Sequence, residues 1–174
     1  MSAMEQSEAE RYRNLMFELA GPGDPSARMG EMPAEARLVV ASAGEDLRTR
    51  PADGEWSVIE LLGHMFDVEL VLGVRLRRTL YEENVKLSGF DQDRWVSAAG
   101  YADAAAEPLL EALASVRPLT IAAWQGASPG QRQNTALHSE RGPEGADTIY
   151  RLLAGHDRFH LDQMRATIEA VRRP

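Results

Sequence analysis

The histidines are the residues whose type and spacing are best suited to chemistry. His156 and His160 lie four residues apart in the segment "LLAGHDRFHLDQM" (152–164), which otherwise has the pattern of an apolar helix face. Side chains with this spacing lie on the same side of a helix, so both imidazoles can reach one cation. A buried neutral imidazole needs either a hydrogen-bond partner or a metal, and this pair taken alone leaves both interpretations open.

A third histidine, His64, lies in another strongly amphipathic segment. If the two segments form neighbouring helices, three neutral nitrogen atoms can converge on one ion, which would keep a coordination position for water or substrate. On its own, His64 is also explained as a core histidine bonded to a backbone carbonyl or to Asp67. The three histidines together therefore indicate a metal site more strongly than any one of them.

Several carboxylates lie close to these histidines in the sequence. Asp67, Asp157 and Glu60 are candidates to orient a ligand imidazole, to coordinate the ion, or to act as a general base. Ordinary solvated carboxylates on a helix surface explain each of them equally well. Gln163, one turn after His160, either hydrogen-bonds within the site or faces a neighbouring helix.

The fourth histidine, His138, lies in the segment "NTALHSERGPEG" (134–145) and is a candidate acid, base or substrate contact, although an exposed loop histidine is the commoner case. Asp91 and Asp93 are spaced like calcium ligands, but no EF-hand loop follows them, so we exclude calcium. The sequence has no glycine-rich phosphate loop, no serine–histidine–aspartate order and no dinucleotide-binding fingerprint.

Helical periodicity predominates in the segments that must position these residues, and no convincing strand pattern appears. The interrupted apolar periodicity and the turn-forming residues predict helices over about 5–20, 33–48, 57–83, 104–125 and 147–172. We expect an irregular connection with one helical turn over 88–101, and a loop over 126–147. About four of these helices form the core of one bundle.

The third helix has the clearest start, because Ser57 and Glu60 have the spacing of a capping box, flanked by Trp56 and Leu61 as a hydrophobic staple. Its apolar residues lie on two sides, one with Leu61, Met65, Val68 and Leu72, the other with Ile59, Phe66 and Leu70. A helix that is apolar on two sides must bury both, so the second needs another helix or a second subunit.

The inner faces of the last two long helices follow from the same periodicity. For the helix over 104–125 we predict an inner face of Leu109, Leu113, Val116 and Ile121. For the last helix the predicted apolar stripe is Ile149, Leu152, Leu153, His156, His160, Met164, Ile168 and Val171.

Composition limits the class of protein. The 174 residues suit a single domain over 1–174, and the chain has no cysteine and no apolar run long enough to span a membrane. The polar, acidic N-terminus lacks a signal-peptide core, so we expect a soluble cytoplasmic protein, and the arginine-rich composition suggests a bacterial source. With 19 basic against 27 acidic residues, a net charge of −8 opposes nucleic-acid binding.

Three segments together resemble the DinB-like metalloenzyme superfamily: "RPADGEWSVIELLGHMFDVE" (50–69), "GFDQDRWV" (89–96) and "LLAGHDRFHLDQM" (152–164). They occur in the order and spacing of that family, and the resemblance covers about 33–171. It implies an all-α, four-helix bundle of up-down-down-up type, often a homodimer, with a metal bound by three histidines. Residue by residue, those ligands correspond to His64, His156 and His160, and the segment around His138 also resembles a family loop.

The resemblance also implies a range of reactions. Characterised members include S-transferases and isomerases that use bacillithiol or mycothiol, and metal-dependent hydrolases. We therefore expect a divalent transition metal (zinc, nickel or iron) that activates a low-molecular-weight thiol or water for attack on a small substrate, with Asp67, Asp157 and His138 as candidate catalytic groups. Because the chain has no cysteine, any nucleophilic sulfur must come from outside. The alternative is a non-catalytic metal- or ligand-binding stress protein.

Overall fold

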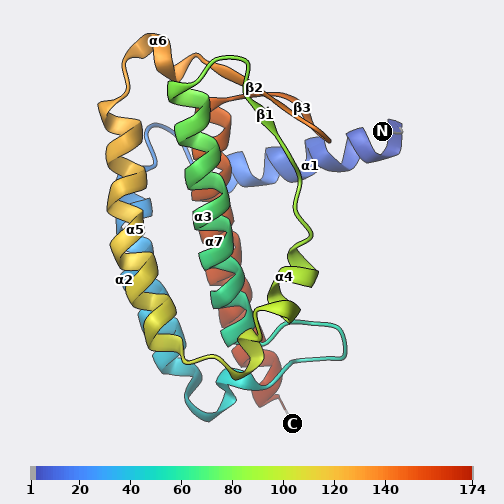
Figure 1. Ribbon diagram of the computed structural model, residues 1–174. Coiled ribbons are helices and arrows are strands. Elements are labelled where there is room, and N and C mark those ends of the chain that lie inside the picture. Colours follow the sequence, from blue (N-terminus) through green and yellow to red (C-terminus); the bar gives the residue numbers. More distant parts are fainter. Residues whose placement is uncertain (1–2, 174) are drawn as a thin grey trace.

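The computed structural model describes residues 3–173, with side chains from Glu10 onward, and most of the chain is helical (Figure 1). Four long helices lie side by side as a bundle: α2 (Ser26–Ala43), α3 (Val58–Tyr81), α5 (Ala106–Gly126) and α7 (Ala146–Arg172). Helices α3 and α5 run in one direction along the bundle, and α2 and α7 run in the opposite one. The predicted all-α bundle with up-down-down-up order is therefore confirmed.

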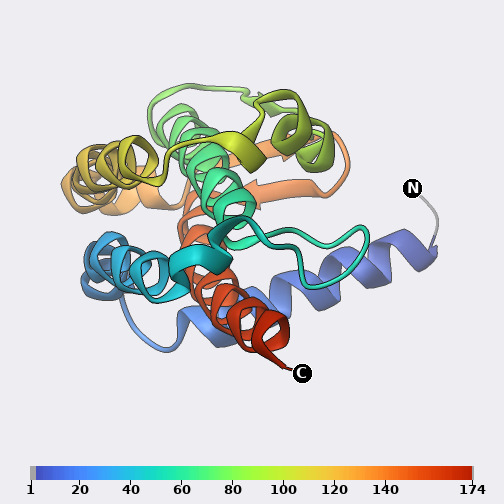
Figure 2. The same ribbon diagram turned by 90° about the horizontal axis from the view of Figure 1, so that it is seen from below.

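The connection between α3 and α5 is long, because two consecutive parallel helices require the chain to return along the whole bundle. This crossover contains β1 (Lys86–Leu87), α4 (Gln92–Ala98) and the short 3₁₀ helix η2 (Tyr101–Asp103). It passes outside α3 on the side away from α2 and α5, as the view from below shows (Figure 2). The irregular connection predicted over 88–101 agrees with this path.

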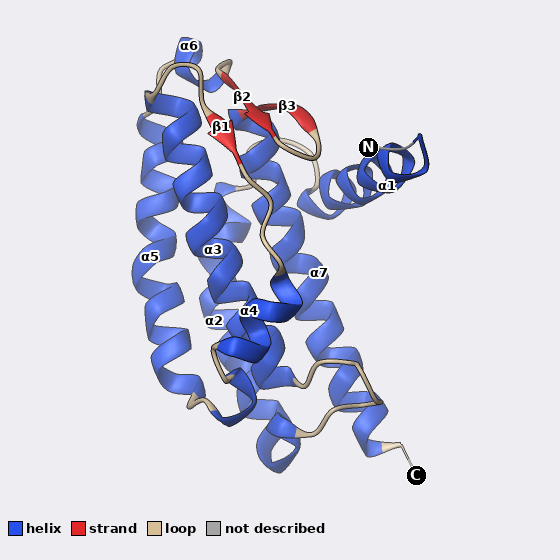
Figure 3. Ribbon diagram, turned by 45° about the vertical axis from the view of Figure 1, so that its right-hand side comes forward, coloured by secondary structure: helices blue, strands red, loops and turns tan. Residues whose placement is uncertain are grey.

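The segment before α7 corrects the predicted loop over 126–147. It contains the short helix α6 (Pro129–Arg132) and two antiparallel strands, β2 (Thr135–His138) and β3 (Gly142–Gly145). Strand β1 pairs in parallel with β2, so a small three-stranded sheet covers one end of the bundle (Figure 3). The expectation of no strand was therefore wrong, because runs of two to four residues are too short to show a period-2 pattern.

Two helix starts show how local signals compare with packing. The capping box at the start of α3 is confirmed: the Glu60 carboxylate accepts hydrogen bonds from the backbone N–H of Ser57 at 2.9 Å and from its hydroxyl at 2.7 Å. Helix α2 instead begins at Ser26, seven residues before the predicted start. Proline suits the first turn of a helix, which is why Pro33 suggested a start, but here it lies inside the helix.

Helix α1 (Ala3–Ala20) crosses α7 at a steep angle rather than joining the bundle (Figures 1 and 2). The crossing depends on Gly155, because a Cβ atom there would lie 2.0 Å from the backbone oxygen of Met16. Glycine thus lets the two backbones touch one residue before His156. No helix in the described range combines the length and the hydropathy of a membrane span.

The interior consists of two apolar clusters with a polar layer between them. One cluster includes Val68 and Leu72 of α3 with Ile149 and Leu153 of α7, and lies toward the sheet. The other lies toward the opposite end of the bundle and includes Leu61 and Met65 of α3, Leu113 of α5 and Met164 of α7. We call the buried groups between them the polar layer: His64, Asp67, Glu69, Arg117, Thr120, His156, Asp157 and His160.

Candidate metal centre

The structure brings together three of the four histidines. One ring nitrogen each from His64 of α3 and from His156 and His160 of α7 lies within 4.8 Å of the others. The Nε2 atoms of His64 and His156 are 2.9 Å apart, and the ring centroids of His156 and His160 are 4.2 Å apart. All three side chains are buried. The spacing of four residues on α7 and the antiparallel neighbour α3 produce this convergence.

The third member of the cluster is oriented by Gln163. The Nδ1–H of His160 donates to Oε1 of Gln163 at 2.8 Å, so in the neutral ring Nε2 carries the free lone pair. Metal-binding imidazoles commonly donate their other N–H to an oxygen acceptor, which fixes the tautomer and the ring orientation. Of the two roles left open for Gln163, the structure shows the one within the site.

Burial lowers the pKa of all three side chains. For His64 the pKa falls to about 3, mainly through desolvation with a contribution from His160. For His160 burial lowers the pKa to about 4, against the opposing hydrogen bond to Gln163. Burial, the two neighbouring histidines and then Arg117 hold the pKa of His156 well below its usual value. Near neutral pH the cluster is thus uncharged, as ligand imidazoles must be.

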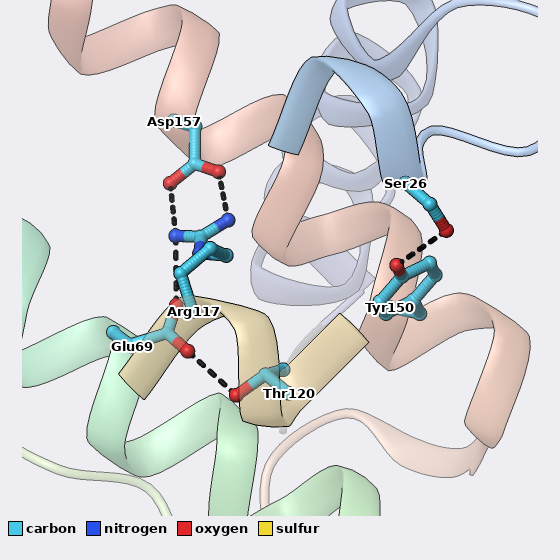
Figure 4. Close-up of polar contacts among 6 residues, drawn as sticks. All are labelled: Ser26, Glu69, Arg117, Thr120, Tyr150 and Asp157. Atoms are coloured by element: carbon cyan, nitrogen blue, oxygen red, sulfur yellow. Dashed lines mark hydrogen bonds and ion pairs between the residues drawn. The ribbon is translucent and has the colours of Figure 1, made fainter. Parts of the chain in front are cut away.

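Asp157 belongs to the other half of the polar layer, where it pairs with Arg117 (Figure 4). Nη2 of this fully buried arginine is 2.9 Å from Oδ1 of Asp157 and 2.7 Å from Oε2 of Glu69, while Nη1 donates to Oδ2 of Asp157. Thr120 donates to Glu69 at 2.6 Å. Burial raises the pKa of Asp157 to about 6 despite Arg117, and the like charge of Glu69 adds to the rise.

Sequence reasoning missed Arg117, and the predicted inner face of α5 was correct only in part: Leu113 is buried, whereas Leu109, Val116 and Ile121 are half-buried. The residues of α5 that are buried are Leu110, Leu113, Arg117, Thr120 and Trp124. Burying a charge is costly without a partner, so the sequence pattern favours an exposed position for an arginine such as Arg117. A usable signal was present, because Glu69 and Asp157 also lie on inward faces of their helices.

Two other carboxylates near the cluster have partners of their own. Oδ1 of Asp67 accepts from the Tyr101 hydroxyl at 2.8 Å, and burial raises the pKa of this carboxyl group. Among the described residues Oδ2 of Asp67 has no hydrogen-bond partner. Glu60 caps α3 and forms an ion pair with Arg50, which occupies both of its oxygen atoms.

His138 is buried at the end of β2, so it is not an exposed loop residue. It does not belong to the cluster of converging nitrogen atoms. Its Nδ1 accepts from the backbone N–H of Glu140 at 3.2 Å, which places the proton of the neutral ring on Nε2. In the described part of the chain this buried Nε2 has no partner.

A cavity of about 460 Å³ lies beside the histidine cluster and has His156 in its wall. Its remaining walls come from α1, α3, the crossover, the β2–β3 hairpin and the first part of α7. The apolar side chains among them include Val68, Leu72, Phe90 and Leu152. Binding sites for small molecules commonly have volumes of about 300–1,000 Å³ and mostly apolar walls with a few polar groups. The cavity therefore has the volume of a small-molecule site, and its wall is more polar and more charged than is usual for one.

The donor set fits a divalent transition metal. Three neutral imidazoles match the ligands of zinc, nickel or iron sites, and three protein ligands leave positions for a further ligand. Two buried nitrogen atoms, Nδ1 of His64 and of His156, have no partner among the described residues, and a metal at Nε2 would place the ring proton on each of them. In metal sites that N–H group commonly donates a hydrogen bond to an oxygen acceptor or to water.

Comparison with known proteins agrees with this fold and gives the family. Residues 31–164 match the model of the DinB superfamily, and the chain belongs to this family. Two proteins of Oceanobacillus iheyensis, OB0782 and OB0413, carry the provisional name of metal-dependent hydrolase. They are 24% identical over 123 residues and 21% identical over 124 residues, and each alignment covers 71% of both chains.

A similar solved structure is that of YfiT from Bacillus subtilis, described as a probable metal-dependent hydrolase with an unusual four-helix bundle topology. The TM-score is 0.76 at 16% sequence identity, and the match covers 98% of this chain and 90% of YfiT. At this identity the match establishes the shared fold alone. In this chain the fold includes the parallel pair of helices α3 and α5, which distinguishes it from a bundle with simple up-down-up-down order.

Proposed function

We propose that this protein is a metal-dependent enzyme that acts on a small molecule, with His64, His156 and His160 as the metal ligands. One observation carries the proposal: the three imidazoles converge while buried and neutral, and one of them forms part of the wall of the 460 Å³ cavity. A divalent ion in such a site supplies a Lewis acid that brings the pKa of a bound water or thiol toward neutrality. The names of the Oceanobacillus relatives and of YfiT support a hydrolytic reaction.

The protein groups around the site have distinct parts in this proposal. Gln163 holds the tautomer of His160, and the charge of Arg117 helps to keep His156 neutral. We propose Asp67 as the general base, because its side chain is buried one helical turn from His64. Its pKa is also raised, so it can exchange a proton closer to neutral pH than an ordinary aspartate. Asp157 positions α7 through its pairing with Arg117, and does not touch the substrate.

Transfer of a low-molecular-weight thiol is the second candidate reaction. The chain contains no cysteine, so the sulfur nucleophile would enter as a co-substrate and share the cavity with the electrophile. Both candidates require the same ligands and differ in the nucleophile. The non-catalytic alternative, a metal- or ligand-binding protein, requires no turnover at all.

Turnover assays on metal-loaded protein distinguish these candidates. Hydrolysis of ester and amide substrates without added thiol would support the hydrolase. Transfer that depends on an added thiol would support the transferase, and metal binding without either reaction would support the non-catalytic alternative. Asp67→Asn serves as the mechanistic variant, and we expect it to lose roughly a hundredfold in kcat while keeping its metal, since a positioned base contributes about 10²–10⁴-fold.

The homodimer predicted from the sequence stays a proposal. On the second apolar side of α3, Ile59 is buried and Phe66 partly buried, whereas Leu70 is 39% exposed. Val74 and Tyr81 continue this side toward the end of the helix and are 57% and 56% exposed. Helix α1 packs on α7 instead of covering them. We expect light scattering at micromolar concentration to give twice the mass of one chain, and Val74→Glu to shift it to the mass of one chain.

A further inference from the structure

Arg75 is a buried arginine that lacks a carboxylate partner. Only 7% of its surface is exposed, and among the described residues its guanidinium makes one hydrogen bond, from Nη2 to the backbone oxygen of Ser88. Its guanidinium carbon also lies 6.0 Å from the ring of Phe90. The other deeply buried arginine, Arg117, has two carboxylates within 3 Å. Buried charges are normally paired, so the single neutral acceptor at Arg75 is unusual.

Arg75 also lies in the wall of the same cavity as His156. On α3 the cavity-facing residues Val68, Leu72 and Arg75 continue the helical stripe that begins at His64. Arg75 is eleven residues beyond His64, which separates their Cα atoms by about 16 Å along the helix axis. The cavity therefore has a histidine end and an arginine end, joined by apolar walls.

The charges around Arg75 do not neutralise it. Glu144 is engaged by Arg141, with Nη2 to Oε2 at 3.1 Å, and Glu140 lies at the protein surface against Gly89. Burial and the like charge of Arg141 lower the pKa of Arg75 more than these two glutamates raise it. The cavity also contains Glu10 and Arg13 of α1, but both are exposed.

A second buried donor without a partner in the described part of the chain lies at the end of strand β2, in the hairpin that forms part of the cavity wall. The buried Nε2–H of His138 has no partner among the described residues. His138 ends strand β2, and Glu140, Arg141, Pro143 and Glu144 of the same hairpin form part of the cavity wall, although His138 itself does not.

From this arrangement we infer that the arginine end of the cavity binds an anionic group, a carboxylate or a phosphate, of an elongated substrate whose apolar body extends toward the histidines. Arginine offers paired N–H groups in a plane that matches both kinds of anion. The inference rests on the proposed function, because it takes the cavity beside the histidines as the substrate pocket. It narrows the substrate class to amphiphilic anions.

Calorimetric titration of the metal-loaded protein with three probes that share a pentyl body tests this inference: hexanoate, pentyl phosphate and hexanamide. We expect at least one anion to bind about tenfold or more tightly than the neutral amide, since hydrogen bonds to charged groups contribute more than those to neutral ones. Tighter binding of pentyl phosphate would assign the group as phosphate, and tighter binding of hexanoate as carboxylate. Equal affinity for all three would overturn the inference and leave Arg75 as a clamp for the crossover at Ser88.

Variants of the arginine locate the effect. Arg75→Gln should remove the preference for the anion, and Arg75→Lys should keep part of it through the charge alone. Arg78→Gln is the matched control, because Arg78 lies on the same helix but is exposed and pairs with Glu82, so the preference should persist. The same loss in Arg78→Gln would mean a general charge effect and would contradict the inference. If Arg75→Gln does not fold, the comparison of the anionic probes with hexanamide in the wild-type protein still tests the inference.

Repeating the titrations after removal of metal with a chelator separates this inference from the proposed function. An anion preference that survives chelation supports the arginine site, whether or not the histidines bind metal. A preference that disappears on chelation but persists in Arg75→Gln would place the anion on the metal, which overturns the arginine site and leaves the metal centre standing. If no metal binds at all, the proposed function fails while the hexanoate result still decides the role of Arg75.

Discussion

The polar layer of this bundle has two halves that lie between the same helices but differ in charge. One half joins Glu69, Arg117 and Asp157 through direct ion pairs in the buried interior. The other half contains His64, His156 and His160, which are neutral near pH 7 and leave two ring nitrogen atoms without partners in the described chain. Of these three, His156 forms part of the wall of the cavity. In the charged half the cation and the carboxylates pair with one another, although Nε of Arg117 has no hydrogen-bond partner among the described residues, whereas the neutral half has converging ring nitrogen atoms and no opposite charge.

The contrast shows what burial demands of polar groups. A buried charge persists only with opposite charge and hydrogen bonds around it, so the arginine network joins α3, α5 and α7 and is not available to a ligand. A buried imidazole avoids the cost of charge by remaining neutral, and its lone pair is then available. We therefore assign stability to the first half and ligand binding to the second.

Breaking the charged half should give the largest effect on stability. Arg117→Met leaves Glu69 and Asp157 buried without their cation, so we expect the free energy of unfolding to fall by about 3–5 kcal/mol. Urea denaturation with metal removed would measure it. Replacing Glu69 and Asp157 by Gln and Asn in the same protein should restore part of the loss. A loss below about 1 kcal/mol would show that the network is not the anchor that its geometry indicates.

The neutral half should respond to metal and pH together. Folded His64 and His160 have pKa values of about 3 and about 4, below the ordinary value near 6.5, so the unfolded chain binds more protons between these limits. Stability from these histidines is thus present above about pH 6.5 and is lost as the pH falls toward 4. Because protons also displace metal from histidine, the stabilisation by metal should shrink in the same range.

Thermal melts of metal-loaded and chelated protein would test this. At about pH 7.5 and with metal at roughly a thousand times its Kd, we expect stabilisation of about 4 kcal/mol, and much less at about pH 5. Equal stabilisation at the two pH values, with bound metal verified, would contradict histidine ligation and favour carboxylate ligands such as Asp67.

The smallest expected effect concerns the residue that orients a ligand. Gln163→Ala removes the hydrogen-bond partner of His160 without removing a ligand, so metal affinity should fall by about 10–100-fold while the fold is retained. Asp162→Ala is a matched control, because that side chain pairs with Arg158 and Arg165 on the surface. Competition with a chromophoric chelator gives both affinities. The same affinity in the two variants would mean that Gln163 does not hold the ring.

The sequence predicted the parts of the fold that depend on local signals. The start of α3 followed from Ser57 and Glu60, which bond to each other in the structure as the capping pattern requires. The stripe of α7 was also correct from Ile149 to Ile168, with all of its predicted residues in that range buried. Both features arise from contacts within about one helical turn, which sequence periodicity describes well.

The features that sequence reasoning missed depend on contacts between distant segments. Strand β2 exists because it pairs with both β1 and β3, and neither neighbour is recognisable from a few residues. Arg117 lies on a buried face because its partners come from α3 and α7. The cavity, and the lack of a carboxylate at Arg75, likewise result from tertiary packing. The sequence identified the histidines because the spacing of His156 and His160 is a local feature of α7, and only His64 comes from another helix.

The most direct test of the account is metal content. We would purify the wild-type protein without added metal or chelator and measure bound ions by elemental analysis, beside the variants His64→Ala, His156→Ala, His160→Ala and His138→Ala. The account predicts about one transition-metal ion per wild-type chain, loss of most of it in each of the first three variants, and its retention in His138→Ala. Full occupancy in His64→Ala would contradict the ligand set that joins α3 to α7.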